Sequence, residues 1–210
     1  RASTAAPVTV LSLWQPLASL LAHGLQRVEG RGWSTQFRGP LWIHAGSKQV
    51  EREDIDKWET LYREVHAADG HADVQFPDRY PTSALVGLVE VVDVVTADEF
   101  SSWTSLPRGL RREGRAHGSG SLFLVRSHRR LPVPLKMSGQ HKLWRLEQRV
   151  AEQVFPHLIP TAQGACCDFA HHRSLASSAL VAPRGGGGGG DGPPLPLLPL
   201  LPLLPLLPLL

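Results

Sequence analysis

Cysteine is almost absent from this 210-residue chain: only Cys166 and Cys167 are present, and they are adjacent. Neighbouring cysteines cannot join distant parts of a fold, so a reducing compartment is the simplest interpretation. The pair also lacks the two-residue spacer of a zinc knuckle, and no second pair of ligands follows it. We therefore expect neither a metal nor another cofactor.

Other common signals are also missing. The glycine run at residues 185–190 is not followed by Lys-Ser or Lys-Thr, which argues against a phosphate-binding loop. No basic stretch followed by an apolar one resembles a secretion signal, so we expect a nuclear or cytoplasmic protein. The Pro-Leu-Leu repeat at 193–210 is apolar, but its prolines remove the hydrogen bonds that a membrane helix requires. We expect no membrane partner.

The small net charge of +3 conceals an uneven distribution. Residues 106–149 contain eleven lysines and arginines against two glutamates, whereas the remainder of the chain is net acidic. A basic segment of this kind favours a surface that faces a polyanion. A solvated basic face that binds nothing is the alternative that charge alone leaves open.

Periodicity predicts an α+β fold. Strands are expected at 9–14, 41–45, 85–95, 122–126, 131–136 and 143–146, and helices at 16–23, 50–69 and 147–155. Many short strands with two or three peripheral helices indicate a small barrel rather than a parallel sheet. We divide the chain into an extension (1–8), one domain (9–155) and a low-complexity, disordered tail (156–210).

Ordered motifs suggest a family. They include Leu11-Ser-Leu-Trp-Gln-Pro16, Phe76-Pro-Asp-Arg-Tyr-Pro81 and Lys142-Leu-Trp-Arg-Leu146, and similar stretches extend from Leu11 to about Val154. Together they resemble the ASCH family, named for activating signal cointegrator 1 homology, and most closely its cointegrator and plant-type branch. The resemblance implies a PUA-like β-barrel with a cleft for RNA or other nucleic acid.

The family signature, Gly-x-Lys-x-x-Glu-x-Arg, reads Gly24-Leu-Gln-Arg-Val-Glu-Gly-Arg31 in this chain, so Gln26 replaces the lysine. Some ASCH-like proteins are amidohydrolases of acylated cytosine compounds, and that type uses the lysine with a threonine where this chain has Glu29. A glutamine side chain supplies no titratable amine, so this chemistry is disfavoured. The signature here favours binding over catalysis.

Glu29 and Arg31 are two residues apart, so in an extended loop they project to the same side and can share the wall of a cleft. The carboxylate could read a base edge and the guanidinium could hold a phosphate. A structural ion pair is the alternative. Trp33 follows, either as a platform for an unpaired base or as a buried anchor of the loop.

The remaining candidate contacts follow from the resemblance and from charge. His44, Ser47 and Lys48 lie at the end of the predicted strand 41–45, and Lys136, Lys142 and Arg145 are later basic positions. A structural role for His44 and ordinary surface roles for the cations remain open, and three tryptophans are assigned to packing: Trp14, Trp42 and Trp144. We expect a binder of RNA or single-stranded nucleic acid in transcription coactivation or RNA metabolism. A protein-interaction adaptor is the other alternative.

Overall fold

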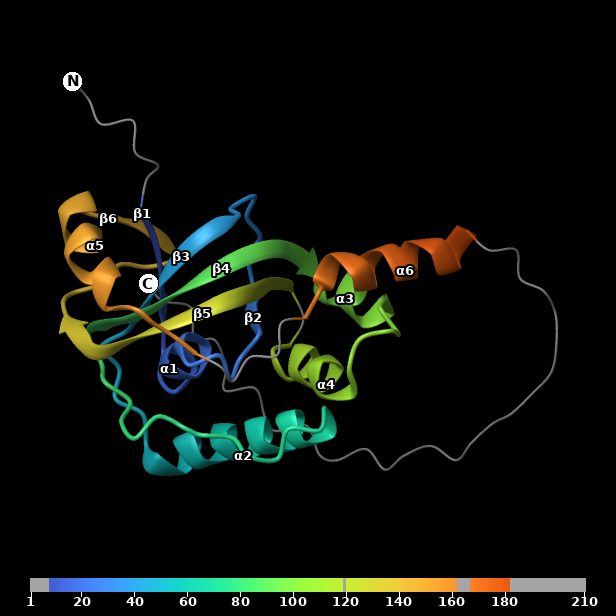
Figure 1. Cartoon of the computed structure of the whole chain (residues 1–210), viewed down its shortest axis with the longest axis horizontal. Coiled ribbons are helices and arrows are strands. Elements are labelled where there is room, and N and C mark those ends of the chain that lie inside the picture. The colour runs from blue at the N-terminus through green and yellow to red at the C-terminus, as the bar shows by residue number, and fades with distance from the viewer. Residues whose placement is uncertain (1–7, 119, 162–166, 182–210) are drawn as a thin grey trace, which may run out of the picture.

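The computed structural model describes residues 8–118, 120–161 and 167–181, and Figure 1 shows how its elements are arranged. The elements in chain order are β1 (Val8–Leu13), α1 (Leu17–Ala22), β2 (Val28–Arg31), β3 (Gly39–Ala45), α2 (Arg52–Ala68), β4 (Ala84–Thr96), α3 (Ala97–Ser102), α4 (Arg108–Ala116), β5 (Ser121–Lys136), β6 (Leu143–Leu146), α5 (Gln148–Val154), the 3₁₀ turn η1 (Phe155–His157), β7 (Ile159–Pro160) and α6 (Phe169–Val181).

One seven-stranded sheet organises the chain, in the order β2-β5-β4-β3-β1-β6, with β7 paired to β5. β1 runs parallel to β3 and antiparallel to β6. The long strands β4 and β5 pair along most of their length, and three shifts of register interrupt that pairing. Such bulges bend strands and increase their twist.

The α+β class is confirmed, but the sheet is not the closed barrel that the sequence predicts. Among the described residues, β2 and β6 lie at the two ends of the strand path and do not pair with one another. Two expected strands, 122–126 and 131–136, are parts of the single strand β5. Pro132 and Pro134 lie beyond the residues of β5 that pair with β2 and β7, as their missing N–H groups require.

Apolar residues cover both faces of the sheet. β1 directs Leu11 and Leu13 into a core shared with α1, and Val10 into a second core with Trp144 and α5. At the end of the sheet where β4 stops and β5 begins, α3, α4 and α6 gather, whereas α5 lies at the opposite end (Figure 1). Trp42 and Trp144 are buried as predicted, but Trp14 is 37% exposed, so its assignment to packing is wrong.

Helix α6 lies within the region that the sequence indicates as a tail. Its first residue, Phe169, is buried in the same core cluster as Trp103 and Leu110. Arg173 pairs with Asp93 of β4 and with Glu99 of α3. The described part of this region is therefore packed against the domain, whereas the glycine run and the Pro-Leu-Leu repeat lie outside the described residues.

Candidate functional site

Three imidazoles hold the loop that carries the signature. In each case a ring N–H donates to a main-chain carbonyl, because a carbonyl can only accept. The donors and acceptors are His23 Nδ1 to Ser19 at 2.8 Å, His128 Nδ1 to Leu21 at 2.7 Å, and His66 Nε2 to Leu25 at 2.8 Å. The carbonyls of Ser19 and Leu21 also accept from the main-chain N–H groups of His23 and Gly24 at the end of α1, so each of these two imidazoles adds a second hydrogen bond there. They fix where the chain turns from α1 into β2.

Burial lowers the pKa of His66 and of His128 below the ordinary value of 6.5 and outweighs the opposing effect of the carbonyl that each donates to. Near and just below pH 6.5, the unfolded chain therefore binds more protons at these two histidines than the folded chain does. The contribution of the two neutral imidazoles to the free energy of unfolding is fully present above pH 6.5 and is lost as the pH falls below this value. We expect the urea midpoint to decrease between about pH 7.5 and about pH 5.5.

The matched control for this prediction is the double variant His66→Gln and His128→Asn. Each amide nitrogen can still donate to the same carbonyl, but neither side chain binds a proton in this range. The acid-induced decrease should be smaller in this variant than in the unmodified protein. An equal decrease would show that other groups cause the loss of stability.

The signature residues form a small buried cluster. Gln26 Nε2 donates to Glu29 Oε2 and to the carbonyl of Val28, the latter at 3.0 Å. Arg31 reaches back along β2, and its NH2 atom lies 2.9 Å from Glu29 Oε1. Glu29 and Gln26 are buried, whereas the Arg31 side chain is 20% exposed. Of the three, only Arg31 presents atoms to a molecule at the surface.

A second buried network lies directly beside the first. Arg27 Nε is 3.0 Å from Glu113 Oε2, and Arg27 NH1 is 3.1 Å from Asp69 Oδ2. Glu113 Oε1 also accepts from the main-chain N–H groups of Arg27 and Val28. Asp69 accepts from the N–H of Gly109 at 2.7 Å. The first turn of α4 and the end of α2 are thus tied to the start of β2, and this network holds the signature cluster in place.

Aromatic side chains from α2 cover the signature cluster. Tyr62 is fully buried, and its hydroxyl lies 2.9 Å from His117 Nε2, at the end of α4. The rings of Trp58 and His117 are 5.7 Å apart. Burial lowers the pKa of His117 despite the carboxylates of Glu29 and Glu113, so the imidazole is neutral at neutral pH. The sequence pattern does not mark Tyr62 and Trp58 as site residues, because an aromatic stripe at helical spacing ordinarily indicates core packing.

Two predicted contacts pack within or against the core. The Trp33 ring is partly buried and packs edge-on against Phe123, with centroids 5.4 Å apart, as the loop-anchor alternative requires. His44 is buried, with Nδ1 3.2 Å from Ser12 Oγ and Nε2 3.1 Å from the carbonyl of Met137. Both ring nitrogens of His44 are therefore engaged within the protein.

The other predicted contacts lie far from the signature cluster. Arg31 pairs with Ser121 at the start of β5, whereas Lys136 ends that strand, so β5 separates them along a contour of about 50 Å. Lys48 lies over the exposed ring of Trp14, with Nζ 4.4 Å from its centroid. Ser47 precedes it on the surface, and Lys142 precedes β6. Register places this group at the other end of β4 and β5.

Lys136 and Arg145 do not join the signature cluster either. Lys136 Nζ donates to the carbonyl of Thr82 at 2.8 Å. Arg145 is exposed on β6, opposite Thr9 of β1. The single cleft expected from the resemblance is thus not formed by all ten predicted residues, and two separate groups take its place.

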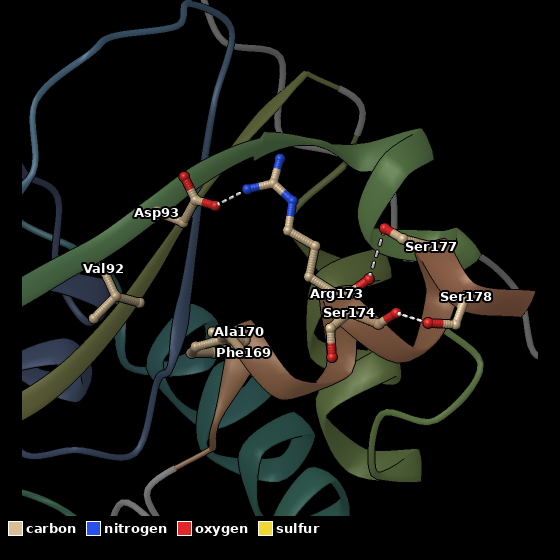
Figure 2. Close-up of a pocket in the computed structure, with 8 residues that line it drawn as sticks. All are labelled: Val92, Asp93, Phe169, Ala170, Arg173, Ser174, Ser177 and Ser178. Carbon is tan, nitrogen blue, oxygen red and sulfur yellow. Dashed lines mark hydrogen bonds and ion pairs between the residues drawn. The ribbon is translucent and has the colours of Figure 1, made fainter.

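A cavity of about 530 Å³ lies elsewhere, between α6 and β4. Figure 2 shows Val92 and Phe169 on its apolar side and Arg173 bridging to Asp93. The hydroxyls of Ser177 and Ser178 donate to carbonyls of α6 itself, which leaves few polar groups to orient a ligand. None of the predicted site residues lines this cavity.

The described part of the chain contains neither a candidate membrane span nor a candidate metal cluster. No helix there is long and apolar enough to cross a membrane. Within the same residues, no three histidine, cysteine or acidic side chains are grouped so as to hold a metal ion. Cys166, half of the adjacent cysteine pair, lies outside the described residues.

Comparison with known proteins gives a consistent result. A sequence profile of the ASCH domain matches residues 11–128. Activating signal cointegrator 1 from Mus musculus and from Homo sapiens are each 32% identical over 140 residues, which is 67% of this chain and 22% of theirs. The chain therefore spans about a fifth of the length of these relatives.

Among solved structures, ASCH from Zymomonas mobilis is 16% identical, covers 74% of this chain and 98% of its own, and has a TM-score of 0.42. A mutant of the same protein has a TM-score of 0.43, again with 16% identity, and the match covers 73% of this chain and all of that one.

Proposed function

Because this chain belongs to the ASCH domain family, we propose that it is a nucleic-acid-binding module whose ligand is RNA or another single strand. We place its role in transcription coactivation or RNA metabolism, in the nucleus or the cytoplasm, by analogy with the name of the cointegrator relatives. We also relate its open, bent sheet to the PUA-like class on the basis of family membership.

One observation carries the proposal: most cations of the basic segment have no carboxylate partner among the residues that the structure describes. Of its eleven lysines and arginines, eight make no ion pair within the described residues, and six of the eight are arginines. They are Arg108, Arg111, Arg115, Arg129, Arg130, Lys136, Lys142 and Arg145. A guanidinium fork matches phosphate geometry. Each cation that neutralises a phosphate also releases a counterion that was condensed on the nucleic acid, and this release drives association.

The lysine and arginines of α2 behave differently. On α2, each of three cations is paired: Arg52 with Asp56, Lys57 with Glu53, and Arg63 with Glu59. That surface is therefore neutralised by its own carboxylates. The lysines and arginines without ion pairs among the described residues lie on α4 and in the second half of the sheet. Few carboxylates there compete with a polyanion for these cations.

Within the signature, we assign Arg31 the contact with the ligand and Glu29 the task of positioning the guanidinium. The exposed fraction of Arg31 supports this division, because Glu29 and Gln26 are buried beneath it. Gln26 holds the other carboxylate oxygen of Glu29, a neutral role that differs from that of the signature lysine. Nothing in this arrangement requires a catalytic group.

We expect the protein to bind a fluorescently labelled 20-mer single strand with an affinity that falls steeply with salt. Four phosphate contacts would give a slope of about −2.8 in log K against log salt, so Kd should rise roughly 50-fold between about 50 and 200 mM salt. Fluorescence anisotropy measures this directly. An affinity that stays constant with salt, or no binding at 50 mM, would contradict the proposal.

A further inference from the structure

Helix α4 carries its arginines on one face. Arg108, Arg111, Arg112 and Arg115 follow the spacing of i, i+3, i+4 and i+7, which places them on a single stripe of a helix. The buried residues of α4 occupy the opposite face: Gly109, Leu110, Glu113 and Gly114. This nine-residue helix therefore has one side for packing and one side that is entirely cationic.

Close packing fixes the direction of the cationic stripe. A side chain at Gly109 would begin 1.9 Å from the carbonyl oxygen of Val65 on α2, and one at Gly114 would begin 2.4 Å from the Phe100 ring on α3. α4 is thus pressed against both neighbours through bare backbone, as Figure 1 shows by its position between α2 and α3. It cannot roll the arginines inward without opening these contacts.

Few carboxylates pair with the arginine stripe of α4. Arg112 pairs with Glu64 of α2, but the structure, over its described residues, gives no acidic partner to the other three. Arg108 and Arg115 are exposed, and Arg111 is half-buried, with a buried Nε that has no hydrogen-bond partner within the described residues. Three cations in about 10 Å of helix make a dense positive surface.

The C-terminal end of the arginine stripe lies beside β2, the strand that carries Glu29 and Arg31 of the signature. α4 contacts β2, and His117 at its C-terminal end packs so closely on Gly30 that a side chain there would begin 2.3 Å from the His117 carbonyl oxygen. Gly30 lies between Glu29 and Arg31 in β2. Arg31, whose side chain is 20% exposed, therefore lies in the strand beside the C-terminal end of α4, beyond Arg115.

We propose that α4 is the phosphate-binding element of this domain, and that the backbone of a single-stranded nucleic acid runs along its arginine stripe from Arg108 through Arg111 and Arg115 to Arg31. This inference rests on the proposed function and names the surface that performs it. The stripe replaces the strand-end group of Lys48, Lys136 and Lys142 as the main contact. Arginine forks bind phosphate and carboxylate oxygens alike in a bidentate manner. The choice of a nucleic acid over an acidic peptide therefore follows from the proposed function, and a poly-glutamate chain tests it.

The test compares two triple variants with the same change in charge. The first is Arg108→Gln, Arg111→Gln and Arg115→Gln, which keeps good helix formers on α4. The matched control is Lys136→Gln, Lys142→Gln and Arg145→Gln, at the other end of β4 and β5. Both remove three cations that lack ion pairs among the described residues, so any difference between them reports position rather than net charge.

In the same anisotropy assay, the α4 variant should bind about 100-fold more weakly near 0.1 M salt, with a slope reduced by about 2. The control should lose no more than about threefold. The single variant Arg115→Gln, at an exposed position, should lose about 5- to 10-fold with a slope change of about 1, and it guards against misfolding of the triple variant. Thermal melts of all variants should match that of the unmodified protein.

The failures are distinguishable. If the unmodified protein binds no oligonucleotide, the proposed function fails and this inference fails with it. If the protein binds but the control variant loses as much as the α4 variant, or more, α4 is not the phosphate-binding element although the function stands. Equally tight binding of a poly-glutamate chain of the same length would overturn the assignment of the ligand as nucleic acid.

Discussion

Replacing Glu113 with alanine is expected to lower the free energy of unfolding by about 3–5 kcal/mol, the range for breaking a buried ion pair. The Glu113 side chain is 1% exposed and accepts hydrogen bonds from the main-chain N–H groups of Arg27 and Val28 as well as from the Arg27 side chain. Without it, a buried guanidinium keeps only Asp69, and two buried donors lose their acceptor. Urea denaturation at neutral pH measures the loss.

Two further variants make this prediction specific. Glu113→Gln keeps an oxygen for the two main-chain donors but removes the charge, so it should cost about half as much. Glu152→Ala, on the exposed surface of α5, should change stability by no more than about 0.5 kcal/mol. A cost for Glu113→Ala as small as that of Glu152→Ala would show that the network around Arg27 does not anchor the signature strand.

Gly109→Ala should destabilise the protein by about 3 kcal/mol, although helix propensity alone favours alanine by about 1 kcal/mol. The new methyl carbon would lie 1.9 Å from the Val65 carbonyl oxygen and 2.6 Å from Asp69 Oδ2. The first obstacle is backbone and cannot rotate away. The second is the carboxylate that binds both Arg27 and the Gly109 N–H, so the clash also disturbs the buried network.

Gly32→Ala is the matched control for this glycine, because a side chain there meets nothing within 4 Å. Its effect should stay within about 0.5 kcal/mol. Thermal and urea unfolding of both variants would decide the matter. Stabilisation by Gly109→Ala would mean that α4 can withdraw from α2, and the fixed direction of its arginine stripe would then be lost.

The sequence predicts the elements whose hydrophobic pattern is regular. The alternation at 9–14 and the three- and four-residue spacing at 50–69 correspond to β1 and α2. Two of the missed elements, β2 and α4, have short or glycine-rich sequences. β2 is only Val-Glu-Gly-Arg, and α4 contains two glycines in nine residues. Tertiary contacts select these structures against local propensity, and a single sequence does not reveal such contacts.

The candidate site shows the same division. The spacing of Glu29 and Arg31 correctly places them on one side of an extended segment, where they form an ion pair. The burial of Gln26 and Glu29 could not be predicted from the sequence, because it results from the packing of α2 and α4 over the loop. The wide separation of Arg31 from Lys48 and Lys136 could not be predicted from the sequence either, since it depends on the length of β5 and on the open sheet.

The position of β1 in the sheet affects how the chain is made. β1 is synthesised before both of its neighbours: β3 follows some 30 residues later and β6 about 130 residues later. While the chain leaves the ribosome, the edge of β1 that β6 will cover has no strand to pair with until residue 143 has emerged. Long-range closure of this kind is slow and leaves a strand edge open to aggregation. A truncated domain that ends at residue 128, where the family match stops, would keep that edge exposed permanently.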